Sequence, residues 1–159
     1  MLLVLSTYVW EYNDISMKHH KERRPLRDIQ LQLASIGASR SQLKQREVLE
    51  LPKILFENEI PKAFIIGFYD GGYGMMLATD LRLLFIDVLP FGRVKIDDIP
   101  YNMVASTTLQ LGMLFGTVSV ASRAKNYRFW WLNKDNASDF NDYIEVQMLK
   151  HQKENVQVK

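Results

Sequence analysis

The stretch "GFYDGGYGMMLATDLRLLFID", Gly67–Asp87, joins two apolar runs of the 159-residue chain through three closely spaced glycines. Loops that cradle phosphates bring backbone N–H groups and a helix N-terminus together around the anion. These glycines match neither of the spacings that such loops use, and a strand-like sequence follows them instead of a helix. Asp70 would also repel a phosphate. We therefore expect a hairpin turn in which Gly71 and Gly72 adopt positive φ.

The sequence around this turn is typical of an antiparallel sheet. Residues 63–69, "AFIIGFY", are β-branched and aromatic, as strand residues usually are. In residues 116–122, "GTVSVAS", Val118 and Val120 face one way while the polar residues between them face the other. Several more short apolar runs lie between these two, separated by turn residues. This spacing predicts an antiparallel sheet or barrel.

A helical pattern ends the chain, from about residue 135 to residue 150. One largely apolar stripe recurs there at intervals of three and four residues: Ala137, Phe140, Tyr143, Ile144, Gln147 and Met148. Asn133, Asp135 and Asn136 offer oxygens for an N-cap. We expect an amphipathic helix that closes the barrel, followed by a polar tail that frays.

Two shorter helical patterns precede the sheet. The first follows Pro25 and ends at Gly37, with apolar residues at Leu26, Ile29, Leu33 and Ile36. The second runs from about Ser41 to Leu51, where Pro52 should end or kink it. Neither is long enough to be stable alone, so we interpret residues 17–51 as a helical arm that packs on something else.

Composition limits the classes of function. The chain has 20 basic and 18 acidic residues, a formal charge of +2, so nucleic acid is not an expected partner. It has no cysteine, which excludes disulfides and thiolate metal sites and suits a reducing compartment. The apolar residues 1–10 reach about half the roughly 20 residues that span a bilayer. Met17 offers a second translation start, in which case residues 1–16 fall outside the native chain.

The residues that could carry catalysis do not form a recognisable set. The three histidines lack metal-ligand spacing, and none lies near the hydroxyl-rich residues 106–108 in the sequence. Asp97 and Asp98 are adjacent, so a strand would point them to opposite faces, and a solvated turn is the better interpretation of this step. We expect no catalytic residue, no metal, no cofactor and no small-molecule substrate.

Four segments resemble a bacterial pleckstrin-homology (PH) domain family of the YokE-like type. The segments are "ELPKILFENEI" (50–60), "GFYDGGYGMMLATDLRLLFID" (67–87), "IPYNMVAS" (99–106) and "LQLGMLFGTVSV" (109–120). The resemblance covers roughly residues 46–149. It implies an α+β fold, a PH-like antiparallel β-barrel or sandwich of about seven strands, capped by a C-terminal helix and preceded here by the helical arm.

The resemblance implies a binding domain and no catalysis. Domains of this type mostly bind lipids, peptides or protein surfaces. Asp80 and Leu81 stand where the family usually has Asn-Lys, so one basic loop residue that a phosphoinositide headgroup would use is missing. We divide the chain into an N-terminal segment and arm (1–51), a PH-like domain (52–150) and a polar tail (151–159).

Two features are candidate surfaces. In "RFWWL", residues 128–132, strand alternation predicts that Phe129 and Trp131 share one face, and that Arg128, Trp130 and Leu132 share the other. One face should enter the core, which leaves an indole that is exposed or covered by a partner, the arm or the N-terminal segment. The basic "KHHKERR" (18–24) follows the apolar residues 1–12 and could bind an anionic membrane. The candidate partner or lipid surface comprises Lys18, Lys21, Arg23, Arg24, Arg82, Arg93, Lys95, Trp130 and Trp131.

These observations favour a non-catalytic, PH-like interaction module that mediates protein–protein contact or self-association. We expect an oligomeric protein in the cytoplasm of a bacterium or its phage, with the arm docking the partner. The alternative is a peripheral membrane domain that binds anionic lipid through the basic residues.

Overall fold

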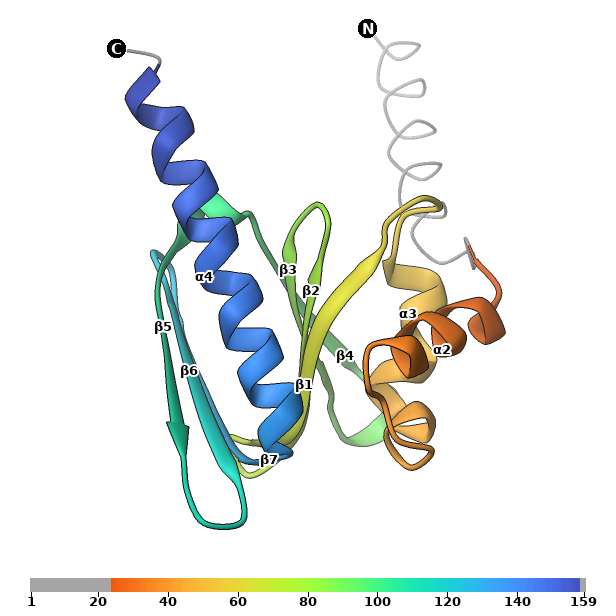
Figure 1. Cartoon of the computed structure of the whole chain (residues 1–159). Helices are drawn as coiled ribbons and strands as arrows, with labels where there is room; N and C mark the ends of the chain where they lie inside the picture. Colours follow the sequence, from red (N-terminus) through yellow and green to blue (C-terminus); the bar gives the residue numbers. More distant parts are fainter. Residues whose placement is uncertain (1–23, 158–159) are drawn as a thin grey trace, which may run out of the picture.

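Seven β-strands and three α-helices run through residues 24–157, the part of the chain that the structure, a computed structural model, describes (Figure 1). Three short 3₁₀ turns, labelled η, lie between them. In chain order the elements are α2 (Leu26–Ser35), η1 (Gln42–Lys44), α3 (Arg46–Ile54), β1 (Pro61–Tyr69), β2 (Gly72–Thr79), β3 (Leu83–Val88), η2 (Pro90–Gly92), β4 (Val94–Ile99), η3 (Tyr101–Met103), β5 (Val104–Leu111), β6 (Gly116–Ser122), β7 (Asn126–Leu132) and α4 (Lys134–Gln157).

The glycine-rich stretch forms the β1–β2 hairpin, as predicted, but its turn lies one residue earlier than expected. Asp70 and Gly71 are the two turn residues, with φ of 45° and 85°. Gly72 instead pairs with Tyr69 as the first residue of β2. Two consecutive positive φ values match the right-handed twist of the flanking strands, and aspartate tolerates this conformation better than most residues.

The strands form one antiparallel sheet in the order β4-β3-β2-β1-β7-β6-β5. Its two halves, β1–β4 and β5–β7, meet where Phe68 of β1 pairs with Trp130 of β7. Gly67 makes this approach possible, because a Cβ there would lie 2.4 Å from Leu132 Cδ2 and 2.6 Å from the Trp130 carbonyl oxygen. The predicted fold is confirmed: seven antiparallel strands, a C-terminal helix and an N-terminal helical arm.

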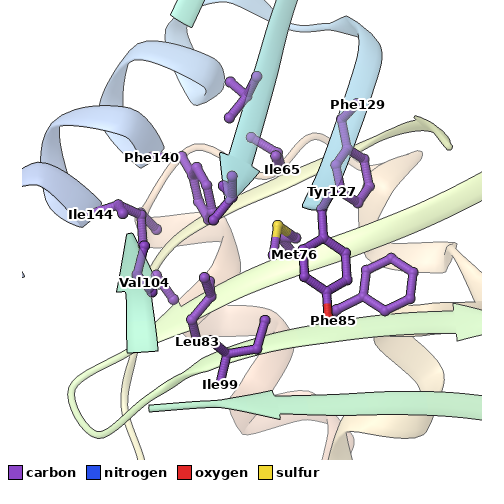
Figure 2. Close-up of a cluster of buried hydrophobic side chains, with 14 of the residues drawn as sticks. Ile65, Met76, Leu83, Phe85, Ile99, Val104, Tyr127, Phe129, Phe140 and Ile144 are labelled. Atoms are coloured by element: carbon purple, nitrogen blue, oxygen red, sulfur yellow. The ribbon is translucent and has the colours of Figure 1, made fainter. Parts of the chain in front are cut away.

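Helix α4 covers the inner side of the curved sheet. In Figure 2, Phe140 and Ile144 of α4 lie on one side of the buried cluster, and Phe85, Tyr127 and Phe129 of the strands lie on the other. The predicted apolar stripe is confirmed, since Ala137, Phe140 and Ile144 are fully buried. Its start is capped as expected: the side-chain oxygen of Asn133 accepts hydrogen bonds from two N–H groups of the first turn.

The closing helix is longer than the stripe indicated. It continues past Lys150 to Gln157. Residues 151–157, "HQKENVQ", contain no glycine or proline, so the backbone there can stay helical.

Helices α2 and α3 cover the outer side of the first half of the sheet, so β1, β2 and β3 are buried on both faces. The second buried cluster joins the two layers: Ile29, Leu33, Val48, Leu51 and Leu55 from the helical region, and Phe64, Ile66, Met75, Leu77, Leu84 and Ile86 from the strands. Burial on both faces explains why these strands are nearly continuous runs of apolar residues. The helices also lie beside the sheet in Figure 1.

The second helix of the arm differs from its prediction. It begins at Arg46, after the 3₁₀ turn, and passes through Pro52 to Ile54. A proline this close to the end of a helix removes only one backbone hydrogen bond. Burial of Leu51 and Leu55 against the sheet outweighs that loss.

Strand β7 contains a bulge that overturns the predicted alternation in "RFWWL". The register against β6 shifts between Gly116 and Val118, so β7 carries one extra residue there. Trp131 takes a φ of 57° at this point. Phe129 and Leu132 are therefore both buried, whereas Trp131 is exposed and does not share the face of Phe129.

Candidate functional site

An aromatic cluster lies outside the covered core, where β1, β2 and β7 meet. The Phe68 ring is its centre, with ring centroids 5.0 Å from Trp131, 6.4 Å from Tyr73 and 6.4 Å from Trp130. Phe68 and Tyr73 lie on the face of β1 and β2 that α2 and α3 cover further along the strands. The helices leave this end open, since Tyr73 is 55% exposed and Trp131 is 60% exposed.

Trp131 adopts a backbone conformation that large side chains rarely take. A left-handed residue other than glycine is disfavoured by roughly 1–2 kcal/mol. The indole of Trp131 faces outward, so its own packing in the core does not explain this backbone conformation. The bulge turns the indole toward Phe68 and solvent while keeping Leu132 inside.

The β5–β6 connection adds an apolar tip beside this cluster. The sequence Gly112–Gly116, "GMLFG", places three exposed apolar side chains between two glycines, and Met113 is 93% exposed. The hairpin extends beyond β7 at the lower end of Figure 1. Its base pairs with the end of β7 through Gly116 and Leu132, next to the bulge. We call the following residues the end patch: Phe68, Tyr73, Leu111, Met113, Leu114, Phe115, Trp130 and Trp131.

The basic residues named from the sequence are divided among different environments. Lys18, Lys21 and Arg23 lie outside the described residues. Arg24 is buried, and its guanidinium donates to the Glu59 carbonyl and, at 2.8 Å, to the side chain of Gln32. The group therefore anchors the start of α2 to the loop before β1.

Arg82 lies in a cradle of two carboxylates, those of the buried Glu59 and the half-exposed Asp98. It donates to both oxygens of Glu59 at 2.9 Å and also binds Asp98. Burial alone would raise the pKa of Glu59, but the hydrogen bonds from Arg82, from the Phe56 N–H and from the Thr79 hydroxyl outweigh it and hold the pKa below the ordinary value. This cradle joins the loop after α3 to the sheet.

Arg93 and Lys95 are exposed near the β3–β4 connection. The two tryptophans lie in the end patch, so no single surface in the described residues joins all the candidates. The proposed lipid-binding role of the basic residues stays a prediction.

A pocket of about 410 Å³ opens between β4 and the β6–β7 turn. Asp97 and Asp98 at its wall lie in strand β4, so the prediction of a solvated turn is wrong. As strand residues they have different partners: Asp97 accepts a hydrogen bond from Tyr127, whereas Asp98 binds Arg82. Lys125 also lines the pocket, with its Nζ atom 3.7 Å from Asp97 Oδ2. Sequence reasoning missed Lys125 and Tyr127 because only the fold brings them near Asp97.

The fold and its surfaces define a PH-like domain without an evident catalytic set among the described residues. Residues 55–146, more than half of the chain, match the family of bacterial PH domains, and the chain belongs to that family. Domains of this family generally act as non-catalytic interaction modules. The YokE-like subtype stays a prediction.

Two solved structures are similar to this chain. One is a pleckstrin homology domain from Shewanella amazonensis, with 18% identity, a TM-score of 0.48, and coverage of 64% of this chain and 94% of the other. The second is a DUF1696 family protein with a pleckstrin-homology domain from Shewanella loihica, with 17% identity, a TM-score of 0.41, and coverage of 63% and 91%. No curated protein matches the chain. In residues 24–157, no helix is both long and apolar enough to cross a membrane.

Proposed function

We propose that the chain is a non-catalytic interaction module that binds another protein chain, either a partner or a second copy, through the end patch. The supporting observation is the group of exposed aromatic and apolar side chains around Phe68, including an indole at 60% exposure on a disfavoured backbone conformation. Tryptophan, tyrosine, phenylalanine and methionine are enriched at protein interfaces.

The aromatic part of the patch suits a binding surface because its rings are already ordered against one another. Phe68 contacts Tyr73 edge-on and lies against Trp131. Ordered rings lose little conformational entropy when a partner covers them. A buried tryptophan at the centre of an interface commonly contributes about 2 kcal/mol or more to binding.

A comparison of matched surface variants tests this proposal. Trp131→Ser combined with Met113→Ser removes two exposed apolar groups of the end patch, while Leu149→Ser removes one of similar exposure on α4, at 57%. Sedimentation velocity measures self-association, and quantitative pulldown from host lysate measures partner retention. We expect the end-patch variant alone to lose the association that the wild type shows. Equal behaviour of all three proteins in both assays would overturn the proposal.

The second candidate is a peripheral domain that binds anionic lipid, in line with the candidate basic residues. The β3–β4 connection supports it: Phe91 is fully exposed at φ of 64°, and the exposed Arg93 and Lys95 follow it. An exposed aromatic ring next to cations suits an anionic membrane surface.

Vesicle flotation distinguishes this candidate from the first. Lipid binding predicts retention on anionic vesicles that falls with added salt, is absent on neutral vesicles, and is weakened by Arg93→Glu together with Phe91→Ser. Binding that is equal on both vesicle types, or no binding at all, would dismiss it.

A further inference from the structure

Three aromatic rings surround the ammonium group of Lys125. The Nζ atom lies 4.9 Å from the ring centroid of Tyr127, 5.0 Å from that of Phe85 and 5.4 Å from that of Tyr69. The rings also contact one another, with centroids 4.8 Å apart for Tyr69 and Phe85 and 4.9 Å apart for Phe85 and Tyr127. We call Tyr69, Phe85 and Tyr127 the aromatic cage.

The walls of the cage are fixed independently of the lysine. Phe85 and Tyr127 belong to the buried core inside the barrel, and Tyr69 packs against that core. They come from β3, β7 and β1, so both halves of the sheet hold them. The Tyr127 hydroxyl also donates to Asp97 Oδ2 at 2.8 Å, which fixes the orientation of its ring.

The lysine, in contrast, covers the cage from the solvent side. Partial burial opposes its charge, but the interaction with Tyr69 outweighs this and raises the pKa of Lys125. The lysine follows the β6–β7 turn, its side chain is 34% exposed, and its nearest carboxylate oxygen, on Asp97, is 3.7 Å away. A second cation lies nearby: Lys95 is also over the Phe85 ring, and the neighbouring Lys125 lowers the pKa of Lys95.

One wall of the cage, Tyr127, also lines the pocket between β4 and the β6–β7 turn, whereas Tyr69 and Phe85 lie behind it. Lys125 and Tyr127 belong to the wall of this pocket, together with Asp97. Its volume of about 410 Å³ falls within the range of roughly 300–1,000 Å³ of small-ligand sites. Aromatic rings combined with a carboxylate at the rim form the kind of environment that binds quaternary ammonium groups.

We propose that the aromatic cage is a binding site for a trimethylammonium group, and that Lys125 is an internal ligand which such a group displaces. A primary ammonium is strongly hydrated, so entering the cage costs it solvation. A methylated ammonium loses less hydration and covers more of the ring faces. Displaced Lys125 can move into solvent because it lies at the end of a turn. The site uses none of the end-patch residues.

Choline titration of the full chain, followed by amide chemical shifts in NMR, tests the proposal. Choline should shift the amides of Tyr69, Phe85, Lys125 and Tyr127. Lys125→Ala removes the internal ligand and should tighten choline binding about tenfold, the scale of one desolvated cation–π contact. Lys150→Ala removes an exposed lysine of α4 and should leave the affinity unchanged.

Two further measurements make the test specific. The neutral isostere 3,3-dimethylbutan-1-ol has the shape of choline without its charge, and it should not bind. Adding Tyr69→Leu to the Lys125→Ala protein should abolish choline binding. Tyr69 is only half-buried, so the fold should survive this change, as circular dichroism can check.

The possible results of these titrations lead to different conclusions. Equal binding of choline and its isostere, or no gain in choline affinity on Lys125→Ala in a folded protein, would overturn the proposal. A peptide with trimethyllysine that competes with choline, while the unmodified peptide does not, would place the cation on a protein side chain. Choline binding without such competition would indicate a free small molecule.

Discussion

The Tyr127 hydroxyl donates a 2.8 Å hydrogen bond to Asp97 Oδ2 and thereby connects β7 to β4, strands from the two halves of the sheet. In the sheet order β4 and β7 are not neighbours. The side-chain bond, together with the 3.7 Å approach of Lys125 to the same carboxylate, therefore joins them where backbone pairing does not.

Tyr127→Phe keeps the buried ring and removes only this bond. We expect the free energy of unfolding to fall by about 1 kcal/mol, the usual net contribution of one hydrogen bond. Urea denaturation followed by circular dichroism measures it. Tyr73→Phe removes an exposed hydroxyl and should leave stability unchanged. Equal effects of the two substitutions would show that the bond does not stabilise the barrel.

Glu59→Gln should lower the free energy of unfolding at pH 7 by about 2 kcal/mol, because Arg82 loses the charge-assisted hydrogen bonds to Glu59 and keeps only its ion pair with Asp98. Glu59 is fully buried, and the Arg82 side chain is 13% exposed. As a control, Glu50→Gln removes a more exposed ion pair with Lys53 and should change stability by less than about 0.5 kcal/mol.

The carboxylate of Glu59 also makes the stability of the protein fall at acid pH. The pKa of Glu59 lies below the ordinary value of 4.5 in the folded chain, so the unfolded chain takes up its proton first. The stabilisation by Glu59 is complete above that value and is lost as the pH falls toward the folded-state pKa. Denaturation at a series of pH values should show a shallower acid decline for Glu59→Gln than for the wild type.

Glu47→Gln should raise the free energy of unfolding at pH 7 by about 1 kcal/mol, which is the usual cost of burying one polar group without a hydrogen-bond partner. Glu47 is buried and its Oε2 has no hydrogen-bond partner. Burial, with a further contribution from Asp87, raises the pKa of Glu47 above 4.5 in the folded chain. The protonated carboxyl therefore contributes to stability below pH 4.5, and this contribution is lost as the pH rises through the folded-state pKa.

The gain from Glu47→Gln should therefore shrink when denaturation is repeated at pH 4. Glu57→Gln changes an exposed residue of the following loop and should be neutral at both pH values. A loss of stability at pH 7 for Glu47→Gln would contradict the prediction.

Gly67→Ala should destabilise the chain by about 3 kcal/mol or prevent folding, because the new methyl group meets the Trp130 carbonyl and Leu132 at overlapping distances. Gly72→Ala has nothing within 4 Å and lies in an ordinary strand conformation, so it should be tolerated. Thermal unfolding of the two variants makes the comparison. Similar melting temperatures would show that β1 and β7 can separate at little cost.

At position 131, glycine should be more stable than alanine by about 1 kcal/mol, since both remove the indole but only glycine adopts positive φ without strain. Elsewhere in a strand the order is reversed, because glycine orders at a greater entropic cost. Denaturant unfolding of Trp131→Gly and Trp131→Ala measures the difference. If alanine proves equal or better, the left-handed conformation is not retained in solution.

Local spacing in the sequence was enough to predict several elements. The closely spaced glycines placed the first hairpin to within one residue, and the stripe from Ala137 to Met148 placed α4 on the core. These predictions depend on neighbours a few residues apart, and helical and strand periodicity report directly on which face is buried. Periodicity could not reveal the extra residue in β7, and that residue reversed the predicted faces of Trp131 and Leu132.

The sequence by itself therefore determined the order of strands and helices, the PH-like class of fold and the presence of unburied tryptophan. Only the tertiary structure decided which residues each candidate functional side chain contacts. It enclosed Arg82 between Glu59 and Asp98, and it placed the ammonium of Lys125 among three aromatic rings. The physical reason is that these contacts join residues that are distant in the chain, and their partners depend on how the two half-sheets curve together, which no local pattern encodes.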